Sequence, residues 1–197
     1  MGGIKELRIE VADCGVHALL AGEGEGRDVI LLHGMKFQAE TWKQTGTLEI
    51  LAGAGFRCLA LDMPGFGKSP AAELAPAEVL VSVISQMGMA RPVLIGPSMG
   101  GRICLEFCLS CPEQVGALVL VGPIGIPENR RRLREIRIPV LAIWGGEDSV
   151  SPLEYGQVLE REIPGSRLKV ISGAPHPCYL EHGDVFHEEV LDFLKNL

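Results

Sequence analysis

Several features that would indicate a membrane or nucleic-acid protein are missing from this sequence. No charge-free apolar run approaches the eighteen or so residues that a membrane-spanning helix needs. The net charge of −7 provides no basic surface for nucleic acid. The first ten residues, MGGIKELRIE, carry charges early and contain no apolar stretch typical of a secretory signal. We therefore expect a soluble, cytoplasmic protein with no nucleic-acid or membrane partner.

Internal repeats and low-complexity segments are also lacking. The 197 residues, 47% hydrophobic and 22% charged, are enough for one core and too few for two ordinary domains, so a single domain over 1–197 is expected. Without a secretory signal, the six cysteines are expected to be reduced thiols rather than a disulfide framework.

Cys104, Cys108 and Cys111 have the C-x3-C-x2-C spacing of a radical iron–sulfur site. The same spacing, i, i+4, i+7, places them on one face of a helix. Because a buried cysteine packs as a small hydrophobe, the pattern favours core packing. We expect no metal and no cofactor.

What the sequence does contain is an alternation of short apolar strands with amphipathic helices. Strands are expected at residues 4–11, 16–21, 29–32, 56–61, 92–95, 115–121, 140–144 and 168–171. Helices are expected around 48–52, 76–87, 102–111 and 186–197. Another helix is expected to start at the capping-box pattern of residues 151–154. The pattern predicts an α/β fold with a doubly wound, mostly parallel sheet and an N-terminal antiparallel hairpin. In such sheets ligands bind beyond the C-terminal ends of the strands.

The sharpest change of period occurs at Ser98, within Gly96-Pro97-Ser98-Met99-Gly100. A strand that turns into a helix within about four residues holds the middle residue in a strained conformation and needs glycine on both sides. The segment from Gly96 to Gly101 also has phosphate-loop spacing, but Arg102 and Ile103 stand where lysine and serine or threonine are needed. An ordinary glycine-rich turn remains open from this motif alone.

Residues that follow the other expected strands include Asp148 and His176. A serine hydroxyl needs a base to take its proton, and an imidazole needs an acid to fix its tautomer. We therefore predict Ser98 as nucleophile, His176 as general base and Asp148 as its orienting acid. Glu147 is the alternative acid.

Two backbone N–H groups should stabilise an oxyanion: that of Met99, next after the nucleophile, and that of Met35, in the loop after the strand ending near His33. His33 is expected to shape that loop, and Asp62 is expected to be a turn residue.

The motifs LLHGM, ALDMPGFGKS, GPSMGG, WGGEDSV and GAPHPCYLE, in this order, resemble the α/β-hydrolase superfamily over nearly the whole chain. The sequence is most similar to the small, lidless α/β-hydrolase-domain "fourteen" group. This resemblance implies a Ser-His-Asp hydrolase acting on small acyl esters or thioesters. It also raises acetyl transfer from lysine to coenzyme A. The elbow GPSMGG departs from the serine-rich version of that group.

The gap at 122–138 is too short for a cap of several helices and leaves room for a loop or one helix. An uncapped, shallow site is expected, with Phe37, Ile124 and Tyr179 contacting a small-molecule acyl substrate. Five arginines between 130 and 137 form either a solvated helix face or an anionic handle for coenzyme A. A monomer or weak dimer is expected. A non-catalytic interaction protein on the same fold is the alternative.

Overall fold

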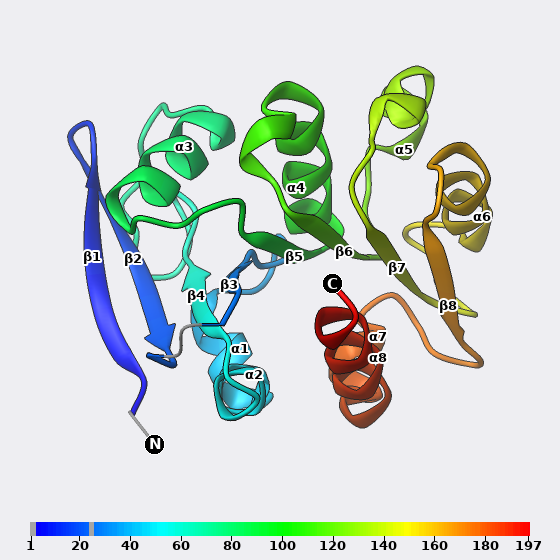
Figure 1. Cartoon of the computed structure of the whole chain (residues 1–197), viewed down its shortest axis with the longest axis horizontal. Coiled ribbons are helices and arrows are strands. Elements are labelled where there is room, and N and C mark those ends of the chain that lie inside the picture. Colours follow the sequence, from blue (N-terminus) through cyan, green and yellow to red (C-terminus); the bar gives the residue numbers. More distant parts are fainter. Residues whose placement is uncertain (1–2, 24–25) are drawn as a thin grey trace.

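The computed structural model describes residues 3–23 and 26–197, so part of the glycine-rich loop expected after the hairpin, residues 24 and 25, lies outside the described residues. Eight strands form one sheet in the order β1-β2-β4-β3-β5-β6-β7-β8 (Figure 1). The strands are β1 (Lys5–Val11), β2 (Cys14–Ala21), β3 (Asp28–Leu31), β4 (Arg57–Leu61), β5 (Val93–Pro97), β6 (Ala117–Val121), β7 (Val140–Gly145) and β8 (Arg167–Ile171).

Strand direction in the sheet confirms the predicted fold class. β1 pairs antiparallel with β2, and β2 pairs antiparallel with β4. All other neighbours, from β4 to β8, are parallel. The fold is therefore a mostly parallel α/β sheet with an N-terminal antiparallel hairpin.

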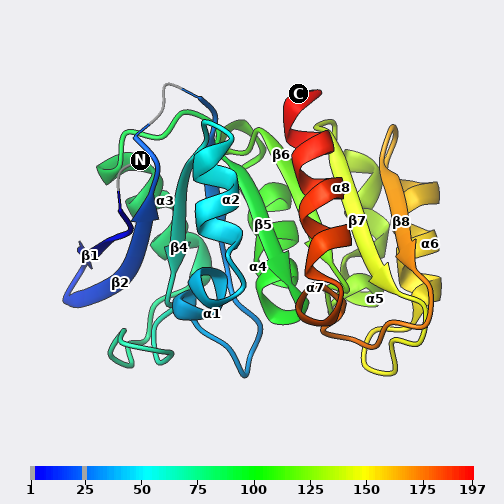
Figure 2. The same cartoon turned by 90° about the horizontal axis from the view of Figure 1, so that it is seen from below.

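Helices cover both faces of the sheet (Figures 1 and 2). One face carries α3 (Pro76–Gln86), α4 (Ser98–Ser110), α5 (Ile126–Asn129) and α6 (Leu153–Glu162). The other carries α1 (Ala39–Gln44), α2 (Thr47–Gly53), α7 (Cys178–Glu181) and α8 (Gly183–Lys195). Short 3-10 helices η1 (Pro112–Gln114) and η2 (Arg130–Glu135) complete the chain. No helix in the described ranges is both long and apolar enough to cross a membrane.

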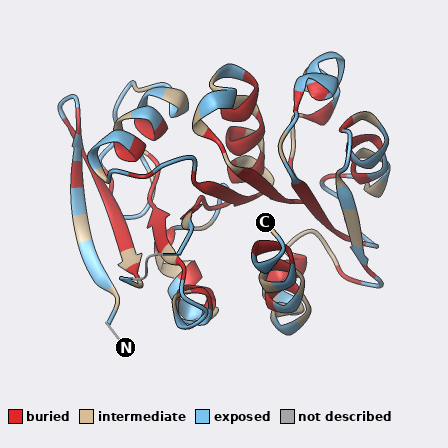
Figure 3. Cartoon of the chain, viewed as in Figure 1, coloured by how far each residue is buried: buried red, intermediate tan, exposed pale blue. Residues whose placement is uncertain are grey.

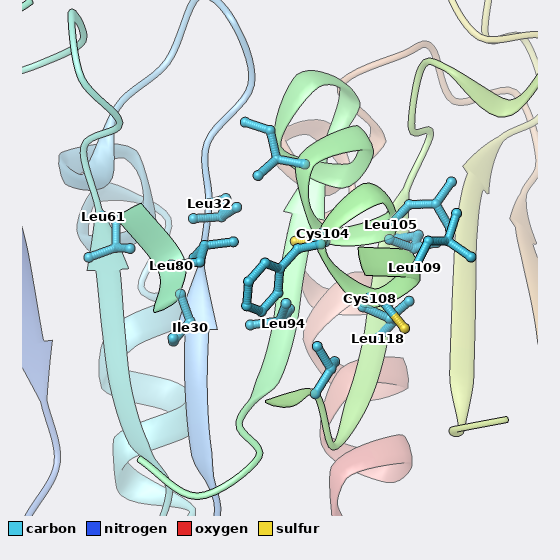
Figure 4. Packing of buried hydrophobic residues seen from close by; sticks show 14 of the residues in the cluster. Ile30, Leu32, Leu61, Leu80, Leu94, Cys104, Leu105, Cys108, Leu109 and Leu118 are labelled. Carbon is cyan, nitrogen blue, oxygen red and sulfur yellow. The ribbon is translucent and has the colours of Figure 1, made fainter. Parts of the chain in front are cut away.

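The central strands are buried on both sides, which explains why they are continuous apolar runs rather than alternating ones (Figure 3). Leu94 and Leu118 pack toward α3 and α4, whereas Val93 and Val119 pack toward the opposite helices. Cys104, on α4, packs in the same cluster as Leu94 and Leu118 (Figure 4). The cysteine pattern thus belongs to the core, with Cys104 and Cys108 buried and Cys111 half-buried.

Several short elements differ from the sequence prediction. The six-residue α1 and four-residue α7 were not predicted, because they are too short to reveal a helical period. The region expected to hold a loop or one helix contains α5 followed by η2. The capping box at 151–154 was wrong in detail, since α6 starts at Leu153 and Ser151 instead donates its hydroxyl to the Pro123 carbonyl, 2.8 Å away.

The β5–α4 junction is the predicted sharp turn. β5 ends at Pro97, α4 starts at Ser98, and Ser98 has a φ of 49°, a left-handed value that side chains rarely adopt. A methyl group at Gly96 would lie 2.4 Å from the Gly100 carbonyl carbon, and one at Gly100 would lie 2.7 Å from the His33 carbonyl oxygen. The glycines are therefore required by close backbone approach.

Replacing Gly96 with alanine tests this steric requirement. We expect Gly96→Ala to lower the free energy of unfolding by about 1–3 kcal/mol, because the new methyl group meets fixed backbone rather than a movable side chain. Gly53→Ala is the matched control, since a methyl there has no neighbour within 4 Å and the residue is helical; it should be neutral or stabilising by up to about 1 kcal/mol. Urea unfolding followed by circular dichroism measures both, and equal stability of the two variants would contradict the steric argument.

Candidate active site

Asp148 and His176 form the best-defined polar contact at the C-terminal edge of the sheet. They follow the neighbouring strands β7 and β8, whose last residues Gly145 and Ile171 are in register. The His176 Nδ1 atom lies 2.7 Å from Asp148 Oδ2. Because an ionised carboxylate only accepts hydrogen bonds, Nδ1 carries the proton and donates it, which leaves Nε2 as the basic nitrogen.

The Asp148 carboxylate is itself fixed. It is buried, and its Oδ1 atom accepts hydrogen bonds from the backbone N–H groups of Val150, at 2.9 Å, and Ser151, at 2.8 Å. The second oxygen is left to face the imidazole. Glu147, the alternative acid, is exposed and has no hydrogen bond or ion pair to His176 in the described part of the chain.

Ser98 and the Asp148–His176 pair are linked through the segment that follows β6. The Ile124 N–H donates to the Ser98 carbonyl oxygen at 3.3 Å. A methyl group at Gly122 would lie 2.9 Å from Asp148 Oδ2 and 3.4 Å from His176 Nδ1. The segment 122–124 therefore contacts the serine turn and the acid–imidazole pair together.

The Ser98 hydroxyl has no hydrogen-bond partner among residues 3–23 and 26–197, and the residue is half-buried. Contacts between a nucleophile and its base are often long in enzymes without substrate and tighten in the complex. The arrangement thus joins Asp148 to His176 directly, and Ser98 to both through segment 122–124.

The loop after β3 lies against the serine turn. A methyl group at Gly34 would be 3.9 Å from the Pro97 carbonyl oxygen. Neither the Met35 N–H nor the Met99 N–H donates a hydrogen bond to any residue in the described ranges. Two free donors on facing segments are the chemical requirement of an oxyanion hole.

His33 holds this loop in shape, as the sequence predicted. Its Nδ1 atom is 2.8 Å from the Gly34 carbonyl oxygen, and its Nε2 atom accepts the Met63 N–H at 3.1 Å. The two contacts need an imidazole with its proton on Nδ1. Burial lowers the pKa of His33 from its ordinary value, which favours this neutral form.

Asp62 does more than complete a turn. Its buried carboxylate accepts the Ala39 N–H at 2.6 Å and the Lys68 N–H at 2.9 Å, and lies 2.7 Å from His17 Nδ1. It therefore ties the start of α1 to β2 and to the loop after β4. The contact with His17 was not predicted, because the pairing of β2 with β4 that brings the two together is not visible in either segment alone.

The three predicted substrate-contacting residues lie in different environments. Phe37 and Ile124 are half-buried, whereas Tyr179 is only 2% exposed. The Tyr179 ring meets Phe37 edge-on, with centroids 6.4 Å apart, and packs against Trp42 at 5.2 Å. Burial raises the pKa of the Tyr179 hydroxyl. In this arrangement Tyr179 supports Phe37 from behind, and direct contact between Tyr179 and substrate stays a prediction.

Two buried histidines make stability depend on pH. Burial lowers the pKa of both His33 and His187 below the ordinary 6.5, so near pH 6 these two imidazoles bind more protons in the unfolded chain than in the folded one. We expect the free energy of unfolding to fall as pH drops from 7.5 through 6.5 to 5. His187→Gln, which keeps a partner for the Thr47 hydroxyl, should reduce this slope. Urea unfolding at each pH measures it, and constant stability over the interval would show that the imidazoles titrate alike in both states.

Comparison with known proteins agrees with the fold and the motifs. The sequence pattern of the alpha/beta hydrolase fold family matches residues 29–133. Human ABHD14B, whose name gives it a provisional protein-lysine deacylase activity, is 36% identical over 187 residues, which cover 90% of this chain and 88% of that protein. Zebrafish ABHD14A is 33% identical over 175 residues, covering 86% of this chain and 64% of that protein.

Solved structures give the same result for the three-dimensional arrangement. A crystal structure described as a predicted CIB-like hydrolase from Thermoplasma acidophilum superposes with a TM-score of 0.95, at 29% identity and covering 99% of both chains. The carboxylesterase CesB of Bacillus subtilis, at 18% identity, shares the fold with a TM-score of 0.88 over 98% of this chain and 92% of its own. The chain thus belongs to the α/β-hydrolase family, as a hydrolase enzyme of the ABHD14 group.

Proposed function

We propose that this chain is a serine hydrolase that cleaves small acyl esters or thioesters through Ser98, His176 and Asp148. The observation that carries the proposal is the 2.7 Å contact between His176 Nδ1 and the buried Asp148 carboxylate, beside a serine held at a strained strand-to-helix turn. An interaction protein would have no need of this combination. The non-catalytic alternative is therefore disfavoured.

The reaction proceeds by acyl transfer to the serine. His176 Nε2 takes the Ser98 hydroxyl proton while the oxygen attacks the acyl carbonyl, and Asp148 stabilises the imidazolium that forms. The Met35 and Met99 N–H groups stabilise the negative oxygen of the tetrahedral intermediate. His176 then protonates the leaving group. In the second half, His176 activates a water molecule that hydrolyses the acyl-enzyme and releases Ser98.

Substrate size follows from the short connection between β6 and β7. That connection holds only α5 and η2, so no large cap encloses the site. Met35, in the loop after β3, and Val150, two residues after Asp148, are apolar residues with 62% and 57% exposure. Small or projecting acyl groups suit such an open rim better than long chains.

The second candidate function is removal of an acyl group from lysine, with coenzyme A as a possible acceptor; the name of human ABHD14B favours it. An acyl-lysine side chain projects from a protein surface and would reach an uncapped site. The arginine cluster at 130–137 is less suited to bind the phosphates of coenzyme A, because three of its members are already paired. Arg130 and Arg134 pair with Glu162, and Arg132 pairs with Glu135. These contacts favour the solvated-helix interpretation of the cluster.

Labelling by a fluorophosphonate probe tests whether Ser98 is an activated nucleophile. We expect wild type to be labelled and Ser98→Ala to show neither labelling nor hydrolysis of short-chain esters, because the probe reacts only with a serine whose proton is taken by a base. Ser85→Ala, an exposed serine on α3, is the matched control and should behave as wild type. Labelling that persists in Ser98→Ala would identify a different nucleophile.

Replacing the acid tests the role of Asp148. Asp148→Asn should lower kcat by up to about 10⁴-fold, since the amide favours the wrong imidazole tautomer. Glu147→Gln changes the neighbouring charge in the same loop and should stay within about twofold of wild type. Ester hydrolysis rates of purified, folded variants provide the measurement. A larger loss in Glu147→Gln than in Asp148→Asn would reverse the assignment of the acid.

A further inference from the structure

An open hollow of about 490 Å³ lies between the loop after β3, which holds Met35, and α1. Its walls are the loop 35–38, Thr41 and Gln44 on α1, and the loop 65–67 after β4. These two loops emerge at the same edge of the sheet (Figure 2). Because Met35 lines the hollow and also supplies an oxyanion N–H in the proposed mechanism, a substrate bound at Ser98 has this space directly beside it.

Lys36 is the single charged residue that lines the hollow. Within residues 3–23 and 26–197 it has no hydrogen-bond or ion-pair partner. Two cations on neighbouring helices, by contrast, are paired. Arg102, one turn into α4, pairs with Glu106 at 2.8 Å, and Lys43 on α1 pairs with Glu40 at 3.1 Å. On a chain with a net charge of −7, a polar hollow lined, among the described residues, by one ammonium and no carboxylate is suited to an anion.

Other groups in the hollow could share in binding an anion. Gln38, Thr41 and Gln44 contribute side-chain amide and hydroxyl donors. The opposite wall contains Gly65 and Gly67, which have no side chain to fill the space and whose positive φ disfavours any other residue there.

The hollow is built before any ligand arrives. The Asp62 carboxylate binds the N–H of Ala39 on one wall and the N–H of Lys68 beside the other. A methyl group at Gly67 would lie 2.1 Å from that carboxylate, so the second loop is packed tightly against it. A single buried acid thus holds the two walls at a fixed separation, which lowers the entropic cost of binding.

We propose that this hollow binds a carboxylate or phosphate of the substrate, so that the enzyme prefers acyl compounds with a negative charge near the scissile carbonyl. The inference rests on the proposed serine hydrolase function and specifies its substrate class. Consecutive Cα atoms are about 3.8 Å apart, so the Lys36 stem begins one residue from the Met35 N–H. The ammonium is thus carried by the residue next to the proposed oxyanion donor, so we place the substrate's negative charge near the carbonyl, either in a short acidic acyl chain or in the leaving group.

Two pairs of matched esters test the proposal and separate these sources. Monophenyl glutarate and its neutral amide, phenyl glutaramate, vary the charge on the acyl side. The second pair, 4-carboxyphenyl acetate and 4-carbamoylphenyl acetate, varies it on the leaving group. We expect wild type to show a kcat/KM ratio of anionic to neutral ester of about 3 to 10 in one pair, decreasing with added salt. The pair that shows the preference identifies the source.

The same ratio should approach one in Lys36→Ala and fall below one in Lys36→Glu. Lys43→Ala removes a lysine from α1 that does not line the hollow, and it should keep the wild-type ratio. A ratio that is the same in wild type, Lys36→Ala and Lys36→Glu for both pairs would overturn the proposal. That result is distinct from failure of the proposed function, which would appear as ester hydrolysis that survives Ser98→Ala.

Discussion

The parallel register of the central strands is the constraint on which the site depends. Pro97 on β5 pairs with Val121 on β6, and Val121 pairs with Ile143 on β7. The chain therefore leaves three neighbouring strands at the same level of the sheet, and the residues that come next meet without any further folding. A shift of one residue in this register would turn every side chain to the other face and separate them.

Buried polar groups convert this convergence into a defined geometry. Asp148 fixes His176, His33 fixes the loop after β3, and Asp62 fixes the start of α1. Each group is buried and hydrogen-bonded, so displacing its partner would leave an unsatisfied polar atom at a cost of about 1–3 kcal/mol. The loops around Ser98 are thus held by interactions that are expensive to break.

The fold, the sharp turn at Ser98 and the Asp148–His176 contact could be predicted from the sequence because the strands and glycines that position them have local signals. Apolar runs such as 117–121 mark buried strands, and the glycines around Ser98 mark the sharp turn. Some contacts between distant segments left no such signal. The Asp62–His17 contact depends on strand pairing between residues that are 45 positions apart. Ser151 resembled a helix cap, but its hydroxyl donates to the Pro123 carbonyl oxygen. Side-chain burial was also inaccessible, so the packing of the Tyr179 ring against Phe37 and Trp42 was not predicted.

Because the connection between β6 and β7 is too short for a large cap, the groups around Ser98 must be held in position by the fold itself. Enzymes that close a lid over substrate can assemble their catalytic groups on closure, but here the connection between β6 and β7 holds only α5 and η2 and is too short for a cap of several helices. Preorganisation must then exist before substrate binds. The strained φ of Ser98 fits this requirement, because a left-handed serine persists only where the surrounding glycines and packed strands leave the backbone no alternative. Backbone strain at Ser98 and hydrogen bonding in the surrounding loops therefore both hold the proposed catalytic groups in place at an open surface.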